Sequence, residues 1–143
     1  MTTSQLHPIV QASLSKYAIT YRVFSCDPSF ADTREFCEQY GFRPDQSANA
    51  IIVVSKNAPH VFACCVVLAT MKLDVNKKVC ELLSIKRASF ASAEQTRQMT
   101  DMEIGGVTIF GIESMPIFVD AAVLNNEETV MGSKHWSLMR IPR

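Results

Sequence analysis

The sequence predicts an α+β fold in a single domain, and three observations lead to this prediction. The chain has 143 residues, enough for one hydrophobic core but too few for two comfortable domains. Segments with apolar residues at helical spacing alternate with segments rich in β-branched and aromatic residues. Most successive strand candidates are separated by short turns, which favours hairpins. We therefore expect one domain over residues 1–143, with a mixed, largely antiparallel sheet that curves toward a barrel and is flanked by helices.

The N-terminal part of the chain has two helix candidates and one strand candidate. Apolar residues recur at helical spacing over residues 4–17, and residues 19–24 are rich in β-branched and aromatic side chains. Asp32, with a glutamate three residues later, resembles a capping box, and Gly41 is a suitable helix stop. A second helix is therefore expected near residues 32–40.

The central part predicts a buried hairpin. Two apolar segments, residues 50–54 and residues 61–69, are joined by a five-residue turn at residues 55–59. Continuous apolar strands of this kind are typical of sheets that are covered on both faces. We expect these strands to pair in the antiparallel sense.

The rest of the chain continues this mixture of helices and strands. Asp74 can cap a helix, and its buried stripe would consist of Val75, Val79, Leu82 and Leu83. Ser92 and Gln95 form a capping-box pattern for a helix that ends at about residue 99. The remaining strand candidates are residues 87–91, 116–123, 128–131 and 136–141, with a turn at Asn125 and Asn126.

Composition and charge narrow the possible functions. The hydrophobic content of 48% and the charged content of 20% are ordinary for a globular protein. Fourteen basic residues balance fourteen acidic ones, which argues against binding of long duplexes but leaves room for a local patch that holds a few nucleotides. The longest apolar run, residues 61–69, is too short to span a membrane, and the N-terminus does not resemble a signal peptide. We expect a cytoplasmic protein.

The cysteines and histidines predict neither a disulfide framework nor a metal site. Five cysteines without a C-x-x-C pair fit free thiols in a reducing compartment. Cys64 and Cys65 are adjacent in a strand candidate, so they should face opposite sides and pack as small apolar residues. His7, His60 and His135 are far apart and lack metal-ligand spacing. No metal and no cofactor are expected.

A glycine-rich stretch, residues 102–120, is the strongest functional candidate. It holds three of the five glycines, Gly105, Gly106 and Gly111, and ends in a carboxylate, Asp120. One interpretation is a tight turn before a hairpin, with Asp120 as a cap at the end of a strand. The other is a loop whose bare backbone approaches a ligand, with Asp120 in the wall of a binding site. The spacing alone leaves both open.

The order of the segments is more specific than any one motif. Pro44-Asp45-Gln46 comes before an apolar strand, and Leu73-Asp74 follows at the start of a helix. Residues 88–93 then lead into a capped helix. After them come GGVT at residues 105–108 and a segment, residues 116–120, that ends in an aspartate. This order resembles the YbaK family, also called the prolyl-tRNA-synthetase-associated editing domain, from about residue 19 to residue 141. The resemblance implies a single α+β domain that deacylates wrongly charged tRNA as a free-standing partner of the synthetase.

The resemblance also assigns roles to individual residues. The family's Gly-Gly-Val/Ile-Ser/Thr-Pro-x-Gly loop matches GGVTIFG at residues 105–111, with Ile109 in place of the proline. The family's pocket lysine falls on Asn49, which can donate a hydrogen bond but carries no charge. The implied catalytic residues are Gly105, Gly106 and Asn49, and the implied substrate-binding residues are Asp120, Ser133, Thr108, Phe24 and Lys134.

Ester hydrolysis is compatible with a site that has no nucleophilic side chain. Such a site must hold the ester, position a water molecule and stabilise the developing oxyanion, for which one preorganised donor contributes about 3–4 kcal/mol. A glycine loop suits this task because no Cβ blocks the approach of the carbonyl. The resemblance further implies that the terminal ribose hydroxyl of the tRNA assists.

Three functions remain open on the sequence. The first is an editing hydrolase that acts on the 3′ end of a mischarged aminoacyl-tRNA, with a small residue on a proline-type or alanine-type tRNA. The second is a binding module that lost the chemistry with the lysine. The third is an interaction protein that docks on an aminoacyl-tRNA synthetase. Candidate RNA contacts are Lys56, Lys72, Lys134 and His135, whereas Trp136 is expected in the core.

Overall fold

The computed structural model describes residues 8–19, 22–25, 41, 43–102, 107–126, 128–133 and 135–142. The strands are β1 (Arg22–Ser25), β2 (Ala48–Ser55), β3 (Phe62–Leu68), β4 (Ala88–Phe90), β5 (Ile117–Val119), β6 (Glu128–Ser133) and β7 (His135–Pro142). The helices are α1 (Pro8–Lys16), the 3-10 turn η2 (Pro44–Gln46), the π-helical turn η3 (Val75–Val79), α3 (Cys80–Leu83), α4 (Ala93–Thr100) and α5 (Ala121–Leu124). Within the described residues, no helix is long and apolar enough to cross a membrane.

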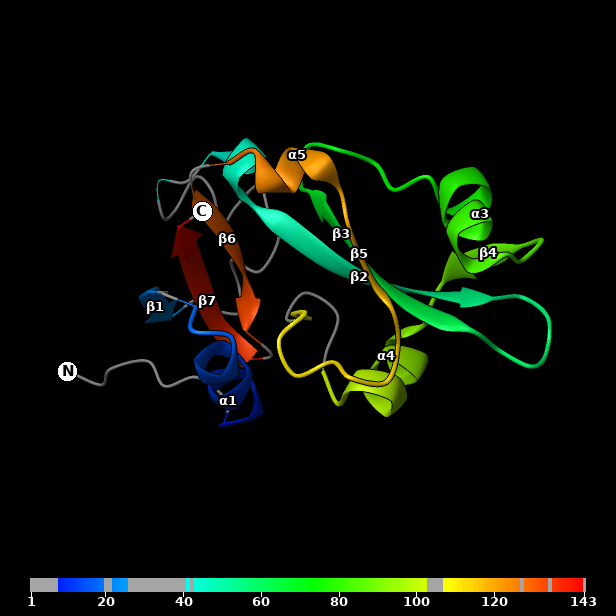
Figure 1. Cartoon of the computed structure of the whole chain (residues 1–143), viewed down its shortest axis with the longest axis horizontal. Helices are drawn as coiled ribbons and strands as arrows, with labels where there is room; N and C mark the ends of the chain where they lie inside the picture. The colour runs from blue at the N-terminus through cyan, green and yellow to red at the C-terminus, as the bar shows by residue number, and fades with distance from the viewer. Residues whose placement is uncertain are drawn as a thin grey trace.

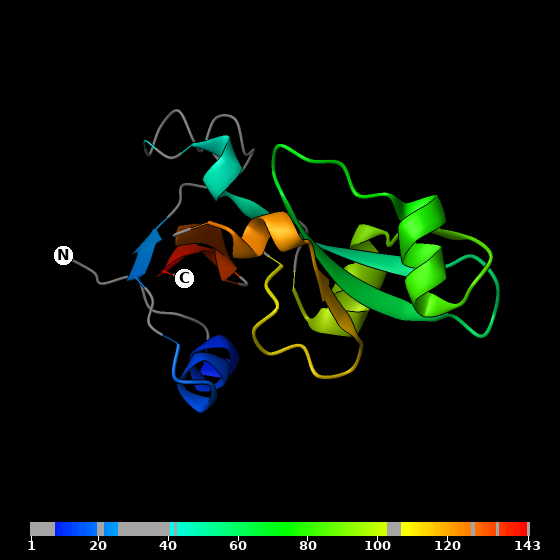
Figure 2. The ribbon, with the colours of Figure 1, turned by 45° about the horizontal axis from the view of Figure 1, so that its top comes forward.

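The strands form two sheets, with strand orders β1-β7-β6 and β4-β2-β3-β5. All pairings are antiparallel except that of β3 with β5, which is parallel. The sheets lie end to end along the long axis of the molecule (Figure 1) and meet at a parallel bridge between Ser47 and Val130. The predicted α+β class with a mixed sheet is confirmed, but the strands do not close into a barrel. Helix α5 lies between the two sheets (Figure 2), because it connects β5 of one to β6 of the other.

The predicted central hairpin is confirmed, with a first strand that is longer than expected and a second strand that is two residues shorter. Its register runs from Ala48 opposite Leu68 to Val54 opposite Phe62. The connection is residues 56–61, and Ser55 organises it: its backbone N–H donates to the Val61 carbonyl at 2.9 Å, and its hydroxyl accepts from the Val61 N–H at 2.8 Å. Cys64 and Cys65 belong to different core clusters, which confirms that they face opposite sides of the sheet.

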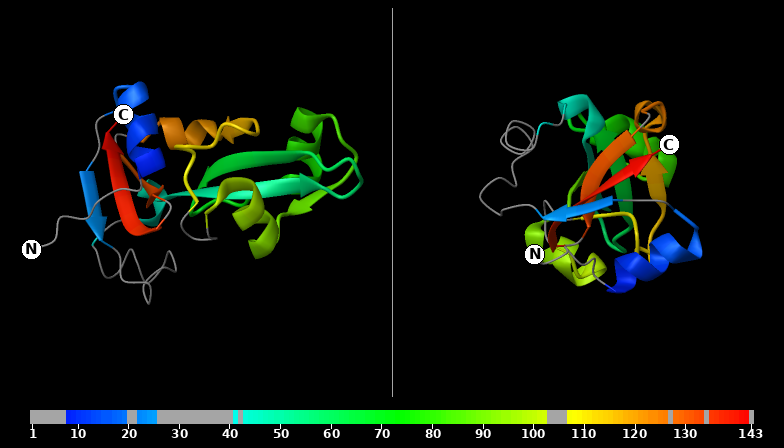
Figure 3. Two further views of the ribbon diagram at one scale, coloured as in Figure 1. Left: turned by 90° about the horizontal axis from the view of Figure 1, so that it is seen from below. Right: turned by 90° about the vertical axis from the view of Figure 1, so that its left-hand side faces the viewer.

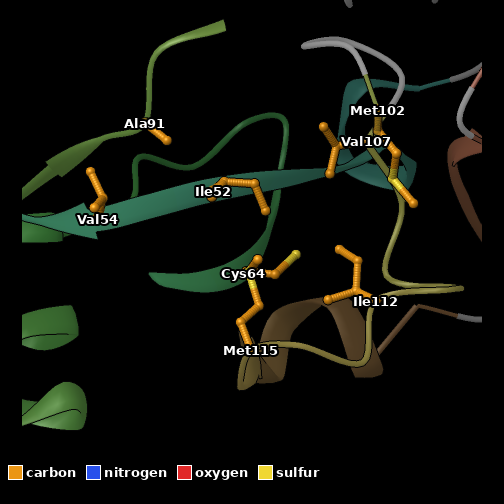
Figure 4. Packing of buried hydrophobic residues seen from close by; sticks show 8 residues of the cluster. All are labelled: Ile52, Val54, Cys64, Ala91, Met102, Val107, Ile112 and Met115. Atoms are coloured by element: carbon orange, nitrogen blue, oxygen red, sulfur yellow. The ribbon is translucent and has the colours of Figure 1, made fainter. Parts of the chain in front are cut away.

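One face of the hairpin is covered by α1 and by the segment after the glycine pair. Near the start of β2, Val10 and Leu14 of α1 pack with Ala48, Val66 and Phe110. Farther along the hairpin, a second cluster joins strand residues to Met102 and to residues 107–115, and Figure 4 shows Cys64 beside Met115 and Ile112. The cluster consists of Ile52, Val54, Cys64, Ala91, Met102, Val107, Ile112 and Met115.

The opposite face is covered by η3 and α3, and here one prediction was wrong. Asp74 caps the segment as expected, accepting a hydrogen bond from the Lys77 N–H at 3.1 Å. Val75 and Val79 are buried, but Leu82 is 46% exposed and Cys80 is buried instead. The first turn is π-helical, and its extra residue rotates the later positions relative to an ideal α-helix.

The other observed boundaries of helices and strands agree with the predicted ones, except after β5. The capping box of Ser92 and Gln95 is confirmed, with reciprocal hydrogen bonds of 3.0 and 3.1 Å. The predicted strand over residues 116–123 ends at Val119, because Asp120 begins α5. The strands predicted near residues 128–131 and 136–141 are present as β6 and β7. The helix predicted near residues 32–40 lies outside the described residues.

Gly111 allows α1 to pack closely against the segment that follows the glycine pair. Its φ is +96°, and an ideal Cβ at this position would lie 2.6 Å from Cγ2 of Ile9 in α1. Real Cβ atoms do not approach other atoms so closely, so a larger residue forces the Ile9 side chain or the backbone beside it to move. The third glycine of the stretch therefore has a packing role as well as a conformational one.

We predict that Gly111→Ala lowers the free energy of unfolding by about 2–4 kcal/mol, from the positive φ and the overpacking together. The matched control is Gly41→Ala, because Gly41 also has a positive φ of +76° but has nothing within 4 Å of an ideal Cβ. Its cost should be only the backbone term, about 1–2 kcal/mol. Adding Ile9→Ala to Gly111→Ala should restore part of the loss in urea unfolding. Equal losses in the two glycine variants would contradict the close approach of α1.

Candidate functional site

Asn49 and Asp120 lie in the same cross-strand row of the larger sheet. Asn49 of β2 pairs with Val67 of β3, and Val66 pairs with Val119 of β5. One residue farther along, Asp120 falls beside Val67, and its N–H donates to the Val66 carbonyl at 2.9 Å, which continues the ladder. Side chains in one row extend from the same face, and two strand spacings separate the outer positions by roughly 10 Å. The structure thus brings together two predicted site residues that are far apart in the sequence.

Asp120 combines a structural role with an accessible carboxylate. One oxygen accepts a hydrogen bond from the Ala122 N–H at 2.8 Å, which caps α5, and the side chain is partly exposed. The cap at the end of a strand, one of the two interpretations of the sequence, is therefore present. A carboxylate has a second oxygen and several acceptor positions, so capping leaves acceptor capacity for a ligand.

Asn49 is exposed, whereas Val67 between the two polar residues is buried. Nearby, the Asn126 amide donates to the Asp45 carbonyl at 2.8 Å and so links the end of α5 to η2 before β2. Sequence reasoning missed this contact and the position of Val67, because both depend on pairings between distant segments. The row therefore has a polar residue at each end and an apolar residue in the middle, and the hydrogen bond between Asn126 and Asp45 joins the segments that flank its two ends.

The remaining predicted site residues do not belong to this row. Ser133 lies at the end of β6, three residues beyond the Ser47–Val130 bridge and at an irregularity in the pairing of β6 with β7. Phe24 lies in β1, which is separated from β6 by β7. For Ser133 and Phe24 the structure describes the backbone, whereas Gly105, Gly106 and Lys134 lie outside the described residues.

Thr108 is fully buried in the segment that covers the other face of the hairpin. The Phe110 N–H donates to its hydroxyl at 3.5 Å, and its own N–H lies 3.5 Å from the sulfur of Met102. Ile109, which stands where the resemblance has proline, packs against the apolar clusters on both sides of this segment. The side chain of Thr108 can therefore affect a ligand only through the loop that it holds in place.

The buried cysteines are not candidates for nucleophilic catalysis. Burial raises the pKa of Cys64 from 9.0 to about 12, with a further contribution from the neighbouring Cys65 thiol. Burial also raises the pKa of Cys65 from 9.0 to about 11. Both thiols are therefore protonated near neutral pH, and the thiolate is the reactive form. In the described part of the chain, no group of three His, Cys, Asp or Glu side chains could hold a metal ion.

Comparison with known proteins identifies the family of this chain. Residues 27–136 match the profile of the aminoacyl-tRNA editing domain, which is most of the chain. The chain belongs to this family. No curated protein sequence matches it significantly. The matched region of this chain includes Asn49, Asp120 and the glycine stretch. Membership of the family implies an aminoacyl-tRNA substrate and hydrolytic deacylation.

Solved structures show the same fold at low sequence identity. The crystal structure of hypothetical protein APE2540 has a TM-score of 0.80 and 18% identity, over 92% of this chain and 86% of that one. A protein named as a candidate trans-editing enzyme for prolyl-tRNA synthetase has a TM-score of 0.77 and 20% identity, over 95% of this chain and 87% of that one. A scaffold protein for epitope grafting by computational design has a TM-score of 0.77 and 18% identity, over 94% and 87% of the two chains.

We predict that the two buried thiols make this editing domain less stable at alkaline pH. Well below pH 9 both thiols are protonated in the folded and the unfolded chain, so they contribute no pH dependence. As the pH rises from about 9 toward about 11, the unfolded thiols ionise while the folded ones remain protonated, and the free energy of unfolding falls. Cys64→Ala should reduce the slope of the unfolding free energy against pH in this window. An unchanged slope would show that Cys64 is not shielded from water.

Proposed function

We propose that this chain is an aminoacyl-tRNA deacylase that acts in trans on mischarged tRNA in the cytoplasm, of the prolyl-tRNA-editing type. Water attacks the carbonyl carbon of the aminoacyl ester and the acyl C–O bond breaks. The ribose oxygen takes up a proton and leaves, so that the products are free amino acid and tRNA. Family membership supports the reaction class, and the name of one structural neighbour supports the prolyl-type substrate.

The observation that carries this proposal is the row that contains Asn49 and Asp120. The aminoacyl ester presents an ammonium group at one end and the terminal nucleotide at the other. The Asp120 carboxylate suits the ammonium, because an ionised acceptor makes strong hydrogen bonds to a cationic donor. Asn49 can donate a hydrogen bond to the terminal nucleotide from the opposite side of the row, roughly 10 Å away. Val67 between them provides an apolar floor.

The other predicted residues complete the proposed site. The backbone N–H groups of Gly105 and Gly106 would stabilise the oxyanion from a loop whose flanking residues, Met102 and Val107, pack on the other face of the hairpin. Thr108 would hold this loop from within the core. Ser133, three residues beyond the bridge between the two sheets, would contact the aminoacyl group. Phe24 and Lys134 would contact the terminal nucleotide by stacking and by charge. No step needs a metal or a cofactor.

The proposal is tested by incubating the purified protein with a panel of mischarged tRNAs and following loss of the ester. We expect Asp120→Asn to lower the rate at least tenfold, because it removes the charge that binds the ammonium group. Asparagine is also a good N-cap, so the stability should change little. Glu113→Gln is the matched control, since Glu113 is an exposed carboxylate whose loss should leave the rate unchanged. Hydrolysis no faster than in buffer would refute the deacylase.

A second function, a binding module without turnover, is favoured by the neutral side chain of Asn49. A module of this kind would bind a non-hydrolysable aminoacyl-RNA analogue and leave the ester intact. Asn49→Lys should then create or increase deacylation at least fivefold, because a cation on this face would stabilise developing negative charge. Gln11→Lys adds the same charge on the exposed side of α1 and should have no effect. A gain from both variants would indicate a general charge effect on RNA binding and not a role for position 49.

A further inference from the structure

The larger sheet ends at β5, and the outer edge of this strand has no partner within the described residues. The strand lies at the front of the molecule in Figure 1 and at the right-hand margin of the right panel of Figure 3, below α5. Ile117 and Val119 of this strand are 36% and 37% exposed. An apolar sheet edge of this kind is a template for pairing with another strand.

The hydrogen bonds to β3 determine which backbone groups of β5 face outward. The Pro116 carbonyl accepts from the Cys64 N–H at 3.0 Å, and the N–H of Asp120 continues the ladder to β3. In a parallel pair, residues that bond to the neighbouring strand alternate with residues whose N–H and C=O point to the other side. The N–H and C=O groups of Ile117 and Val119 therefore point away from β3, and in the described part of the chain no strand pairs with them.

These outward groups are self-complementary about a two-fold axis. If two copies of β5 pair in the antiparallel sense with Phe118 on the axis, Ile117 of each copy lies opposite Val119 of the other. Directly opposite residues with outward N–H and C=O groups exchange both of their N–H···O bonds, and the axis produces this pair twice. The Ile117 and Val119 side chains lie on one face of the sheet, where opposite β-branched residues pack favourably.

The opposite edge of the same sheet is protected by charge, whereas the β5 edge is not. Strand β4 is directly preceded by Lys86 and Arg87, which are both exposed, and cations at an edge oppose pairing with another strand. Residues 114–119 carry no charge. In the two-fold pair, Asp120 of one copy lies opposite Pro116 of the other, so no like charges face each other. A second copy therefore fits the β5 edge in both hydrogen bonding and charge.

We propose that two copies of this chain associate through β5, which joins their larger sheets into one continuous sheet across a two-fold axis. The strand contributes only three residues from each copy, far fewer than a permanent dimer needs, so the association is reversible and depends on concentration. It also extends the candidate site, because Pro116 of the second copy lies next to Asp120 at the end of the Asn49–Asp120 row. The pairing needs no substrate and does not rest on the proposed function.

The test is sedimentation velocity of the purified protein over a range of concentrations, without RNA. The mass of the wild type should rise from 15.9 kDa toward twice that value. Ile117→Lys and Val119→Glu should each weaken self-association at least tenfold, because each places a charge opposite an apolar residue of the other copy. A wild type that stays at 15.9 kDa at the highest soluble concentration would overturn the proposal and leave this edge to a strand of a different protein.

A mixture of the two single variants tests the register. In the mixed pair, the lysine of Ile117→Lys lies opposite the glutamate of Val119→Glu, and the unchanged Val119 and Ile117 form an apolar pair on the other side of the axis. The mixture should therefore associate at least tenfold more tightly than either variant alone. A mixture that associates no more tightly than the single variants would contradict the antiparallel register.

The matched control is Phe90→Lys, which places the same charge at an exposed apolar position on the opposite edge of the sheet. It should leave self-association unchanged, and a loss equal to that of Ile117→Lys would overturn the assignment to β5. Amide hydrogen exchange adds a local measurement, because the N–H groups of Ile117 and Val119 should exchange more slowly as the dimer forms. A dimer in which these two amides exchange as fast as in the monomer uses another surface, and the proposal fails.

Discussion

The antiparallel pairing of β2 with β3 is the constraint on which the rest of the structure depends. The hairpin runs through the larger sheet, and its alternate residues belong to clusters on opposite faces. A fully buried valine or isoleucine contributes about 1.5–3 kcal/mol, so neither face can be left open. Helix α1, together with Met102 and residues 107–115, covers one face, and η3 with α3 cover the other. The positions of all four are set by the register of the hairpin.

The same register determines the geometry of the candidate site. Asn49, Val67 and Asp120 come from three segments, and the row exists because β5 adds to β3 in parallel with a fixed offset. Asp120 both ends this strand and begins α5, which leads the chain to the smaller sheet. A residue that ends a strand, caps a helix and carries a charge near a ligand links the fold directly to recognition. We infer that its position is more constrained than that of an ordinary surface carboxylate.

Local signals in the sequence determined much of the fold. The apolar runs of the hairpin, the capping box at Ser92 and Gln95, and the helix start at Asp74 depend on neighbouring residues, and each is present in the structure. The π-helical turn that exposes Leu82 and the end of β5 at Asp120 were not determined in this way, because packing and strand addition decided them. For the site, the sequence indicated Asn49 and Asp120 separately through a resemblance. Only the tertiary structure placed them in one row, because cross-strand register between distant segments is set by the joint burial of both faces and not by any local pattern.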